Sequence, residues 1–170
     1  MRFYLRLICF SFALLYGLQI PAFVQIYSVI VDARLTEAEQ NLAGFQQTAD
    51  LHFDGDMLEM IEYYQTHADK LIEQTGENIR QIHQSVMRLK QQQQHLSQSE
   101  VKAAWYVLTQ YNSPIWQQAQ SKYNYQIQFS PVVISWGISI ALLSLVAIDL
   151  IYALLLIMFA LVKPKRIATQ

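Results

Sequence analysis

Residues 7–24 read LICFSFALLYGLQIPAFV, and no charged side chain follows this run until Asp32. A helix needs about 20 mostly apolar residues to cross a bilayer. Residues 7–31 are therefore predicted to form a first transmembrane helix. Residues 132–162 carry a single charge, Asp149, and are predicted to form a second transmembrane helix that includes a few external first turns. The sequence thus predicts an all-α integral membrane protein.

The composition of the chain excludes several protein classes. Of 170 residues, 53% are hydrophobic and 15% are charged, with only 5 glycines and 4 prolines. Collagen-like and disordered chains have a different composition. A formal net charge of −1 gives no reason to expect nucleic acid as a partner, because phosphate backbones are bound by positive surfaces. The single Cys9 cannot form an internal disulfide and is predicted to be a small buried hydrophobe.

Basic residues at the two ends of the chain indicate its orientation in a membrane. They are Arg2, Arg6, Lys163, Lys165 and Arg166. Because basic residues beside a span tend to stay in the cytoplasm, residues 1–6 and 163–170 are predicted to be cytoplasmic. Residues 32–131 are then external, in the periplasm of a Gram-negative cell. The expected location is the bacterial inner membrane, with the lipid bilayer as a partner.

A cleaved signal peptide is the alternative interpretation of the first apolar run, since basic residues precede it. Cleavage requires a small-x-small site after a short apolar core. Residues 19–24 read QIPAFV and contain no convincing site of this kind. The helical pattern also continues beyond them, so a retained signal anchor is the prediction.

The external domain is predicted to be helical and coiled-coil-like. Two sets of apolar positions recur every three or four residues, and each set would share one helix face. The first set comprises Val31, Leu35, Ala38, Leu42, Phe45 and Ala49. The second comprises Ile79, Ile82, Val86, Leu89 and Leu96, with Gln93 as one polar member. The candidate packing face drawn from both consists of Leu35, Leu42, Phe45, Ile79, Ile82, Val86 and Leu89. Such faces pack on each other or on a second copy, so a homo-oligomer or a membrane-protein complex is expected.

Turn and capping residues divide this domain into helices. Residues 54–56 (DGD) are predicted to end the first helix and cap the next. Gly76 is predicted to separate a short turn from a longer helix, and residues 97–100 (SQSE) to form a capping box. The helix that follows carries one apolar face, with Val101, Ala104, Trp105, Leu108 and Tyr111. Pro114 is predicted to begin the last helix, and residues 123–129 (YNYQIQF) to form an extended aromatic tether.

Asp149 most needs an explanation, because a carboxylate deep in hydrocarbon costs about 2.5–3.5 kcal/mol even on lenient scales. Counted from the nearest basic residue at each end, Gln19 and Asp149 lie 13 and 14 residues deep. They would therefore meet in an antiparallel helix pair, and Tyr16 and Tyr152 would share a neighbouring level. The hypothesis is that Gln19, with Tyr16 or Tyr152, hydrogen-bonds Asp149 and locks the helices together. A proton relay in an oligomer and a carboxylate at the membrane surface are the alternatives.

No catalytic or metal-binding pattern stands out. The histidines, His52, His67, His83 and His95, lack the i, i+3 or i+4 spacing with which a helix holds zinc. The acids of residues 50–59 lack the offsets of a calcium loop. The sequence has neither a nucleophile motif nor a glycine-rich phosphate loop. It therefore predicts a protein that is not an enzyme and has no cofactor or metal.

Several blocks of the sequence resemble the bacterial DUF2937 family. They are QIPAFV (19–24), VDARLTEA (31–38), LAGFQ (42–46), Ala49, Asp50, Phe53, Trp105, residues 123–129, Pro131 and WG (136–137). The resemblance covers nearly the whole chain and implies a small proteobacterial membrane protein with two spans. It implies no activity and supplies no catalytic residues. Residues 68–72 (ADKLI) depart from the family pattern.

The function expected from these features is that of a non-catalytic interaction, accessory or scaffold protein that presents a helical domain to the periplasm. One alternative is a sensor module that signals through a partner chain, because only residues 163–170 follow the last span. The other is a transporter or enzyme subunit that uses Asp149 within an oligomer.

Overall fold

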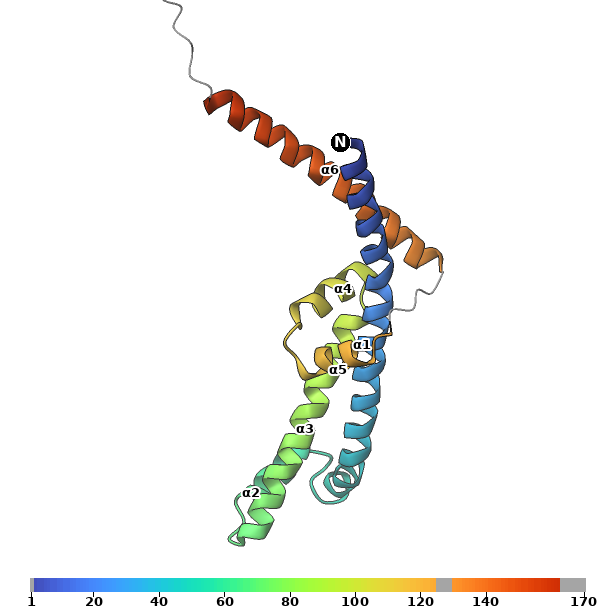
Figure 1. The fold of residues 1–170 in the computed structure, drawn as a ribbon. Coiled ribbons are helices and arrows are strands. Elements are labelled where there is room, and N and C mark those ends of the chain that lie inside the picture. Colours follow the sequence, from blue (N-terminus) through green and yellow to red (C-terminus); the bar gives the residue numbers. More distant parts are fainter. Residues whose placement is uncertain (1, 125–129, 163–170) are drawn as a thin grey trace, which may run out of the picture. The chain divides into compact units, whose positions relative to one another are not determined.

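The computed structural model describes residues 2–124 and 130–162, which form six α-helices (Figure 1). The helices are α1 (Arg2–His52), α2 (Met57–Gln65), α3 (Lys70–Leu96), α4 (Glu100–Thr109), α5 (Pro114–Lys122) and α6 (Pro131–Val162). The all-α prediction is therefore confirmed. The predicted cytoplasmic tail and most of the aromatic tether lie outside the described residues.

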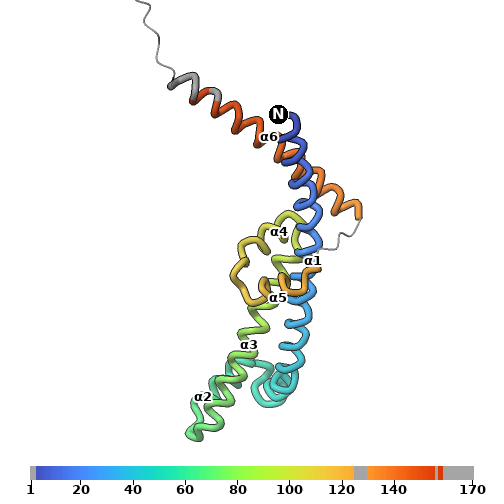
Figure 2. The backbone as a smooth tube through the Cα atoms, in the orientation of Figure 1, coloured from blue at the N-terminus to red at the C-terminus, as the bar shows by residue number. Residues whose placement is uncertain are grey.

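The chain divides into two units. Unit 1 comprises residues 1–22 and 124–170, and unit 2 comprises residues 23–123. Helix α1 belongs to both units and is traced without a break (Figure 2). Pro21 lies inside α1 next to the boundary between the units. A proline inside a helix has no N–H to donate and tends to kink it, so the boundary coincides with a locally weakened helix.

Helices α1 and α6 are both long and apolar enough to cross a membrane. Only 6% of the most apolar window of each helix is buried within the protein. Neither window therefore resembles the core helix of a soluble protein, which its neighbours cover. Cys9, predicted to be buried, is only partly buried.

Two glycines allow the helices of unit 1 to approach closely. A Cβ atom on Gly17 would lie 2.9 Å from the Cα atom of Gly137, and one on Gly137 would lie 2.7 Å from Cδ2 of Leu18. Ala141, four residues after Gly137, is fully buried. Small residues four apart are typical of helix pairs in membranes, because they let the backbones come into contact.

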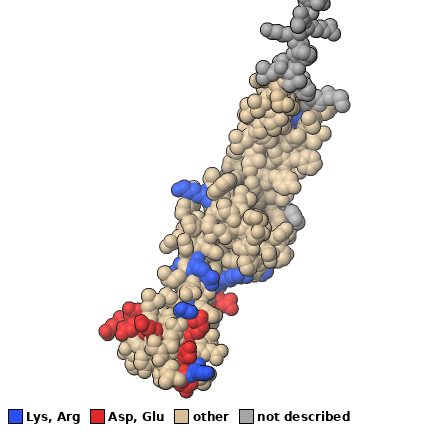
Figure 3. Space-filling view, turned by 90° about the vertical axis from the view of Figure 1, so that its left-hand side faces the viewer, with Lys and Arg blue, Asp and Glu red and all other residues tan. Residues whose placement is uncertain are grey.

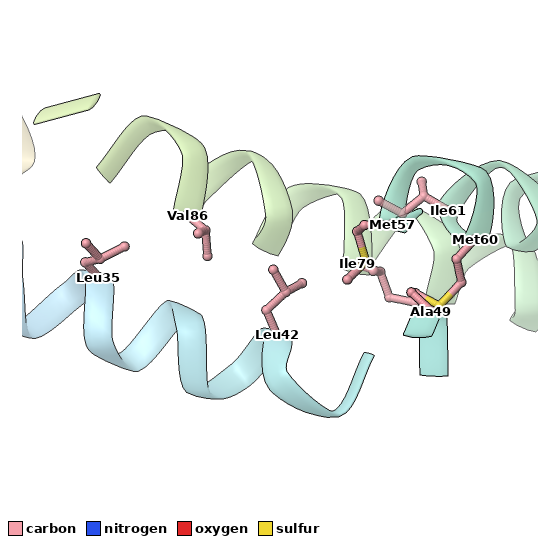
Figure 4. Close-up of a cluster of buried hydrophobic side chains, with 8 residues drawn as sticks. All are labelled: Leu35, Leu42, Ala49, Met57, Met60, Ile61, Ile79 and Val86. Carbon is pink, nitrogen blue, oxygen red and sulfur yellow. The ribbon is translucent and has the colours of Figure 1, made fainter. Parts of the chain in front are cut away.

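Unit 2 has two apolar clusters. The first joins the second half of α1 to α2 and α3 and contains Leu35, Leu42, Ala49, Met57, Met60, Ile61, Ile79 and Val86. Figure 4 shows Leu35 and Leu42 of α1 facing Val86 of α3. The second cluster joins α1 to α4 and α5 and contains Tyr27, Ile30, Val31, Val107, Ile115 and Ala119. Helix α1 is therefore the common wall of both clusters.

Residues 54–56 end the first helix as predicted. Asp54 and Gly55 have positive φ angles of 49° and 83°, a region that favours glycine. Asp56 then accepts hydrogen bonds from the backbone N–H groups of Leu58 (2.8 Å) and Glu59 (3.1 Å) and caps α2. The predicted helix start at Pro114 is also confirmed, with Ser113 as its N-cap.

One predicted helix boundary and one predicted cap are wrong. Gly76 lies inside α3 rather than before it, and α3 is instead capped by Asp69. The reason is packing, because a Cβ atom on Gly76 would lie 2.8 Å from Cβ of Tyr64 on α2. The predicted capping box at residues 97–100 is also not formed, since Ser97 ends α3 and Ser99 precedes α4 without a side-chain cap.

Candidate functional site

The described partner of Asp149 is Arg6, whose guanidinium donates to the carboxylate. Both side chains are about half exposed within the protein, at 49% and 52%. Pairing compensates the two charges, which is how ionisable residues in apolar segments are usually accommodated. The proposed hydrogen bond from Gln19 stays a prediction.

The two tyrosines of the candidate polar contact differ in exposure. Tyr16 is 71% exposed within the protein and therefore presents its ring to the surroundings of α1. Tyr152 is partly buried on α6. Their part in the lock also stays a prediction.

Helix register explains why Arg6 reaches Asp149. Gly17 and Gly137 mark the place where α1 and α6 approach. Arg6 lies 11 residues before Gly17, and Asp149 lies 12 residues after Gly137, which is about 17 Å along each helix. The pair is thus nearly equidistant from the crossing. Depth along each helix was counted from the basic residues at the chain ends. Counting it from Gly17 and Gly137 instead would have predicted the pairing of Arg6 with Asp149.

The candidate packing face is covered by the chain itself. Leu35, Leu42, Ile79 and Val86 are buried in the first cluster of unit 2. Phe45, Ile82 and Leu89 are partly buried and pack against the same cluster. The two apolar faces therefore meet within one chain, which buries four of these side chains and partly covers the other three.

Polar contacts lie along the same pair of helices. The Nε2 group of Gln93 donates to Asp32 at 2.9 Å, and the Nζ atom of Lys90 lies 2.9 Å from a carboxylate oxygen of Glu39. These two polar contacts, together with the apolar packing, therefore fix the alignment of α1 against α3. The glutamine-rich stretch that contains Gln93 takes part in this contact.

A groove of about 400 Å³ lies beside the contact between α3 and α4. It is lined by His95, Gln98, Val101, Lys102, Trp105, Tyr106 and Thr109. The His95 ring stacks on the Tyr106 ring, with centroids 4.7 Å apart. Burial raises the pKa of the Tyr106 phenol, with a smaller contribution from the nearby Tyr27. Tyr106 is therefore a neutral phenol at physiological pH.

The apolar face expected on the fourth helix is turned outward. Helix α4 buries Ala103, Ala104 and Val107. On its other side Val101 is 66% exposed, Trp105 is 70% exposed and Leu108 is 51% exposed. Sequence periodicity placed Ala104 with these large residues, but the small side chains are the ones that let α4 pack closely. The large ones form an apolar surface on unit 2.

Charge is unevenly distributed over unit 2. Residues 50–77 contain eight acidic side chains and one basic side chain, Lys70. Figure 3 shows acidic side chains gathered at one end of the unit, which α2 and the start of α3 form, with basic side chains next to them. Among residues 2–124 and 130–162, no three His, Cys, Asp or Glu side chains gather as metal ligands would.

One family model matches this sequence. It is described as protein of unknown function (DUF2937), and the match covers residues 1–161. No curated protein and no solved structure is detectably similar to the chain.

Proposed function

The chain belongs to the DUF2937 family, whose function is unknown, and from that premise we propose that it is a non-catalytic interaction or scaffold protein of the bacterial inner membrane. Its two apolar helices anchor it, both chain ends are cytoplasmic, and unit 2 is periplasmic. The basic residues at the two ends support this orientation.

The continuity of α1 carries the proposal. This helix spans Arg2–His52, and its first part is the apolar segment while its second part supplies Leu35, Leu42 and Ala49 to the core of unit 2. The membrane anchor and the wall of the folded domain are therefore one element. Such a construction is suited to presenting a helical surface beside a membrane.

Exposed apolar side chains on unit 2 support a docking role. Beyond α4, the large ones that are more than half exposed are Val29, Leu51, Leu58, Tyr63, Leu71, Met87 and Tyr111. Four of these seven lie in residues 51–71, within the acidic part of the chain. Apolar side chains rimmed by charges are typical of protein–protein contacts. The expected partner is a membrane protein that offers a basic, partly apolar surface outside the bilayer.

Crosslinking in intact membranes tests this proposal. Mild crosslinking, affinity purification and mass spectrometry should recover a membrane-protein partner in a fixed ratio. Leu58→Ser with Leu71→Ser should reduce the recovered partner at least several-fold, and Tyr111→Ser, which removes an exposed side chain outside residues 51–71, is the control. Recovery that is unchanged by the double variant, or recovery of the uncrosslinked chain alone, would overturn the docking role.

Cysteine labelling tests the orientation. In a Cys9→Ser background, Leu71→Cys places a thiol at a side chain that is 73% exposed, whereas Met60 is fully buried and unsuitable. A membrane-impermeant maleimide should label Leu71→Cys in cells whose outer membrane alone is permeabilised. A cysteine at position 170 is the control and should need inner-membrane permeabilisation. The reverse pattern would contradict a periplasmic unit 2.

A further inference from the structure

We propose that the outer face of α4 is seated on the phospholipid surface, with Val101, Trp105 and Leu108 among the lipid headgroups. The proposal rests on membrane anchoring by α1 but not on the docking role of residues 51–71. It assigns to α4 a second membrane contact that is separate from the two spans.

The exposed face of α4 has the form of a membrane-surface helix. Val101, Trp105 and Leu108 occur at i, i+4 and i+7, so they project from one side of the helix. Each of them is more than half exposed, while Ala103, Ala104 and Val107 hold the other side against unit 2. Large apolar side chains on one exposed helix face are typical of a site that contacts a membrane or another protein. A bilayer surface covers such a face by taking it up to the depth of the headgroups.

The part of α1 on which α4 packs favours lipid, rather than another protein, as the contact of the exposed face. Helix α4 is held in unit 2 through Val107, which packs in the cluster of Tyr27 and Val31 on α1. The run LICFSFALLYGLQIPAFV ends at Val24, three residues before Tyr27 and seven before Val31, so Tyr27 and Val31 lie in the last two turns of the predicted 7–31 span. Those distances are about 5 and 10 Å along a helix, comparable to the headgroup layer outside a bilayer core. The segment of α1 that binds α4 is therefore the one that leaves the lipid.

Aromatic side chains gather at the same segment. Phe23 packs on Trp116 with centroids 4.6 Å apart, and on Tyr123 with centroids 5.6 Å apart. With Trp105 on the outer face of α4, this group has the composition of the aromatic belts found at membrane surfaces. The aromatic rings around Phe23 and the exposed face of α4 therefore both consist of side chains that favour a membrane surface.

The charge of α4 and α5 also favours contact with a phospholipid surface. Helices α4 and α5 carry Lys102 and Lys122 against a single acid, Glu100. The acidic side chains of unit 2 are instead concentrated in residues 50–77. Lysines beside an apolar face strengthen binding to anionic lipids, whereas the acidic end would be repelled by them. The expected surface is a bilayer that contains anionic phospholipid.

Tryptophan quenching in nanodiscs tests the proposal on the full chain. Trp116→Phe with Trp136→Phe leaves Trp105 as the single tryptophan, which is excited selectively over the tyrosines. The nanodiscs contain phosphatidylglycerol and phosphatidylcholine. Replacing the phosphatidylcholine with a form that is dibrominated on its acyl chains should lower Trp105 emission about twofold, because the apolar face of a membrane-surface helix reaches the boundary between headgroups and acyl chains. Aqueous iodide should quench the same emission only weakly.

A matched reporter provides the control. Trp105→Phe in that background, with Leu71→Trp, moves the fluorophore to an exposed position at the start of α3. This reporter should be quenched by iodide and unaffected by brominated lipid. If Trp105 behaves in the same way, the lipid seat is wrong. Protection of Trp105 from both quenchers would also overturn it, because a second copy or another protein would then cover α4.

A second label keeps the test independent of the tryptophan substitutions. Val101→Cys in the Cys9→Ser chain, carrying a nitroxide, should relax faster with oxygen than with an aqueous nickel complex. The opposite order would overturn the proposal. Loss of the partner in the Leu58 and Leu71 variants, by contrast, leaves both measurements unchanged, so failure of the docking role and failure of the lipid seat are distinguishable.

Discussion

The guanidinium group of Arg6 donates a hydrogen bond to the carboxylate of Asp149, 143 positions later in the chain. This pair joins the first turns of α1 to the second half of α6. It accounts for the one charge in the second apolar segment without requiring a transport pathway. A structural pairing is therefore the simpler interpretation of Asp149.

Loss of one member of this pair should cost more than loss of both. Asp149→Leu leaves the Arg6 charge uncompensated, whereas Arg6→Leu with Asp149→Leu removes both charges. Because both side chains are about half exposed within the protein, the expected coupling is small, about 0.5–1 kcal/mol. Thermal unfolding of the two single variants, the double variant and the parent in nanodiscs measures it. Strictly additive losses would show that the pair contributes nothing.

Asp149→Asn should be tolerated better than Asp149→Leu. Asparagine retains a hydrogen-bond acceptor for Arg6 or Gln19 without the cost of a carboxylate in hydrocarbon. Leucine retains neither and should lower the unfolding midpoint in the same nanodisc assay. Equal midpoints for the two variants would contradict a structural role for this side chain.

Gly17→Ala should weaken the packing of α1 on α6. The new Cβ atom would lie 2.9 Å from the Cα atom of Gly137, a backbone atom that cannot rotate away. Forcing the helices apart is expected to cost about 1–3 kcal/mol. Gly44→Ala is the control on the same helix, because no atom lies within 4 Å of its Cβ position, and it should stabilise by about 0.5–1 kcal/mol. Thermal unfolding distinguishes the opposite signs, and stabilisation by both substitutions would refute the close approach.

Gly76→Ala should destabilise unit 2 although alanine favours helices. Its Cβ atom would meet Cβ of Tyr64 at 2.8 Å and the backbone nitrogen of Gln65 at 2.9 Å. The expected packing cost of about 1–3 kcal/mol exceeds or offsets the gain of about 1 kcal/mol in helix propensity. Amide hydrogen exchange in α2 should therefore speed up, since this short helix is displaced first. Exchange as slow as in the parent chain would show that α2 is not seated against Gly76.

Acid should weaken the polar contacts of Glu77. Hydrogen bonding from Gln81 is the main cause that lowers the pKa of the Glu77 carboxyl, and Arg80 adds to the effect. A carboxyl with a lowered folded-state pKa contributes stability above its unfolded pKa, and that stability is lost as the pH falls through the folded value. Gln81→Ala should raise the pKa of Glu77 toward its ordinary value in a carboxyl NMR titration. Gln84→Ala, one turn along on α3, is the control, and an identical titration of both variants would exclude Gln81 as the cause.

Local signals in the sequence were sufficient for the helices and several of their ends. The uncharged run from residue 7 and the turn at residues 54–56 predicted where α1 lies and where it stops. Pro114 predicted the start of α5. These features depend on each residue's own backbone preference and polarity, which are the same in any fold.

The site residues were less predictable, because periodicity shows which side chains share a face but not what covers that face. Leu42 and Val86 proved to be buried by their own chain, although the same pattern also suits a contact between two copies. Depth counted from the chain ends missed the Arg6–Asp149 pair. The pair depends on where the glycines let the helices cross.

Helix content, the two apolar segments and the charge asymmetry thus follow from the sequence alone, since they are sums of local preferences. Packing in three dimensions was needed to place Gly76 inside α3, to turn Trp105 outward and to bring Arg6 to Asp149. In each case the outcome depends on the shape of a surface contributed by a distant part of the chain. Closely packed helices require small side chains at their contact. The apolar periodicity of one helix does not show where another helix will come that close.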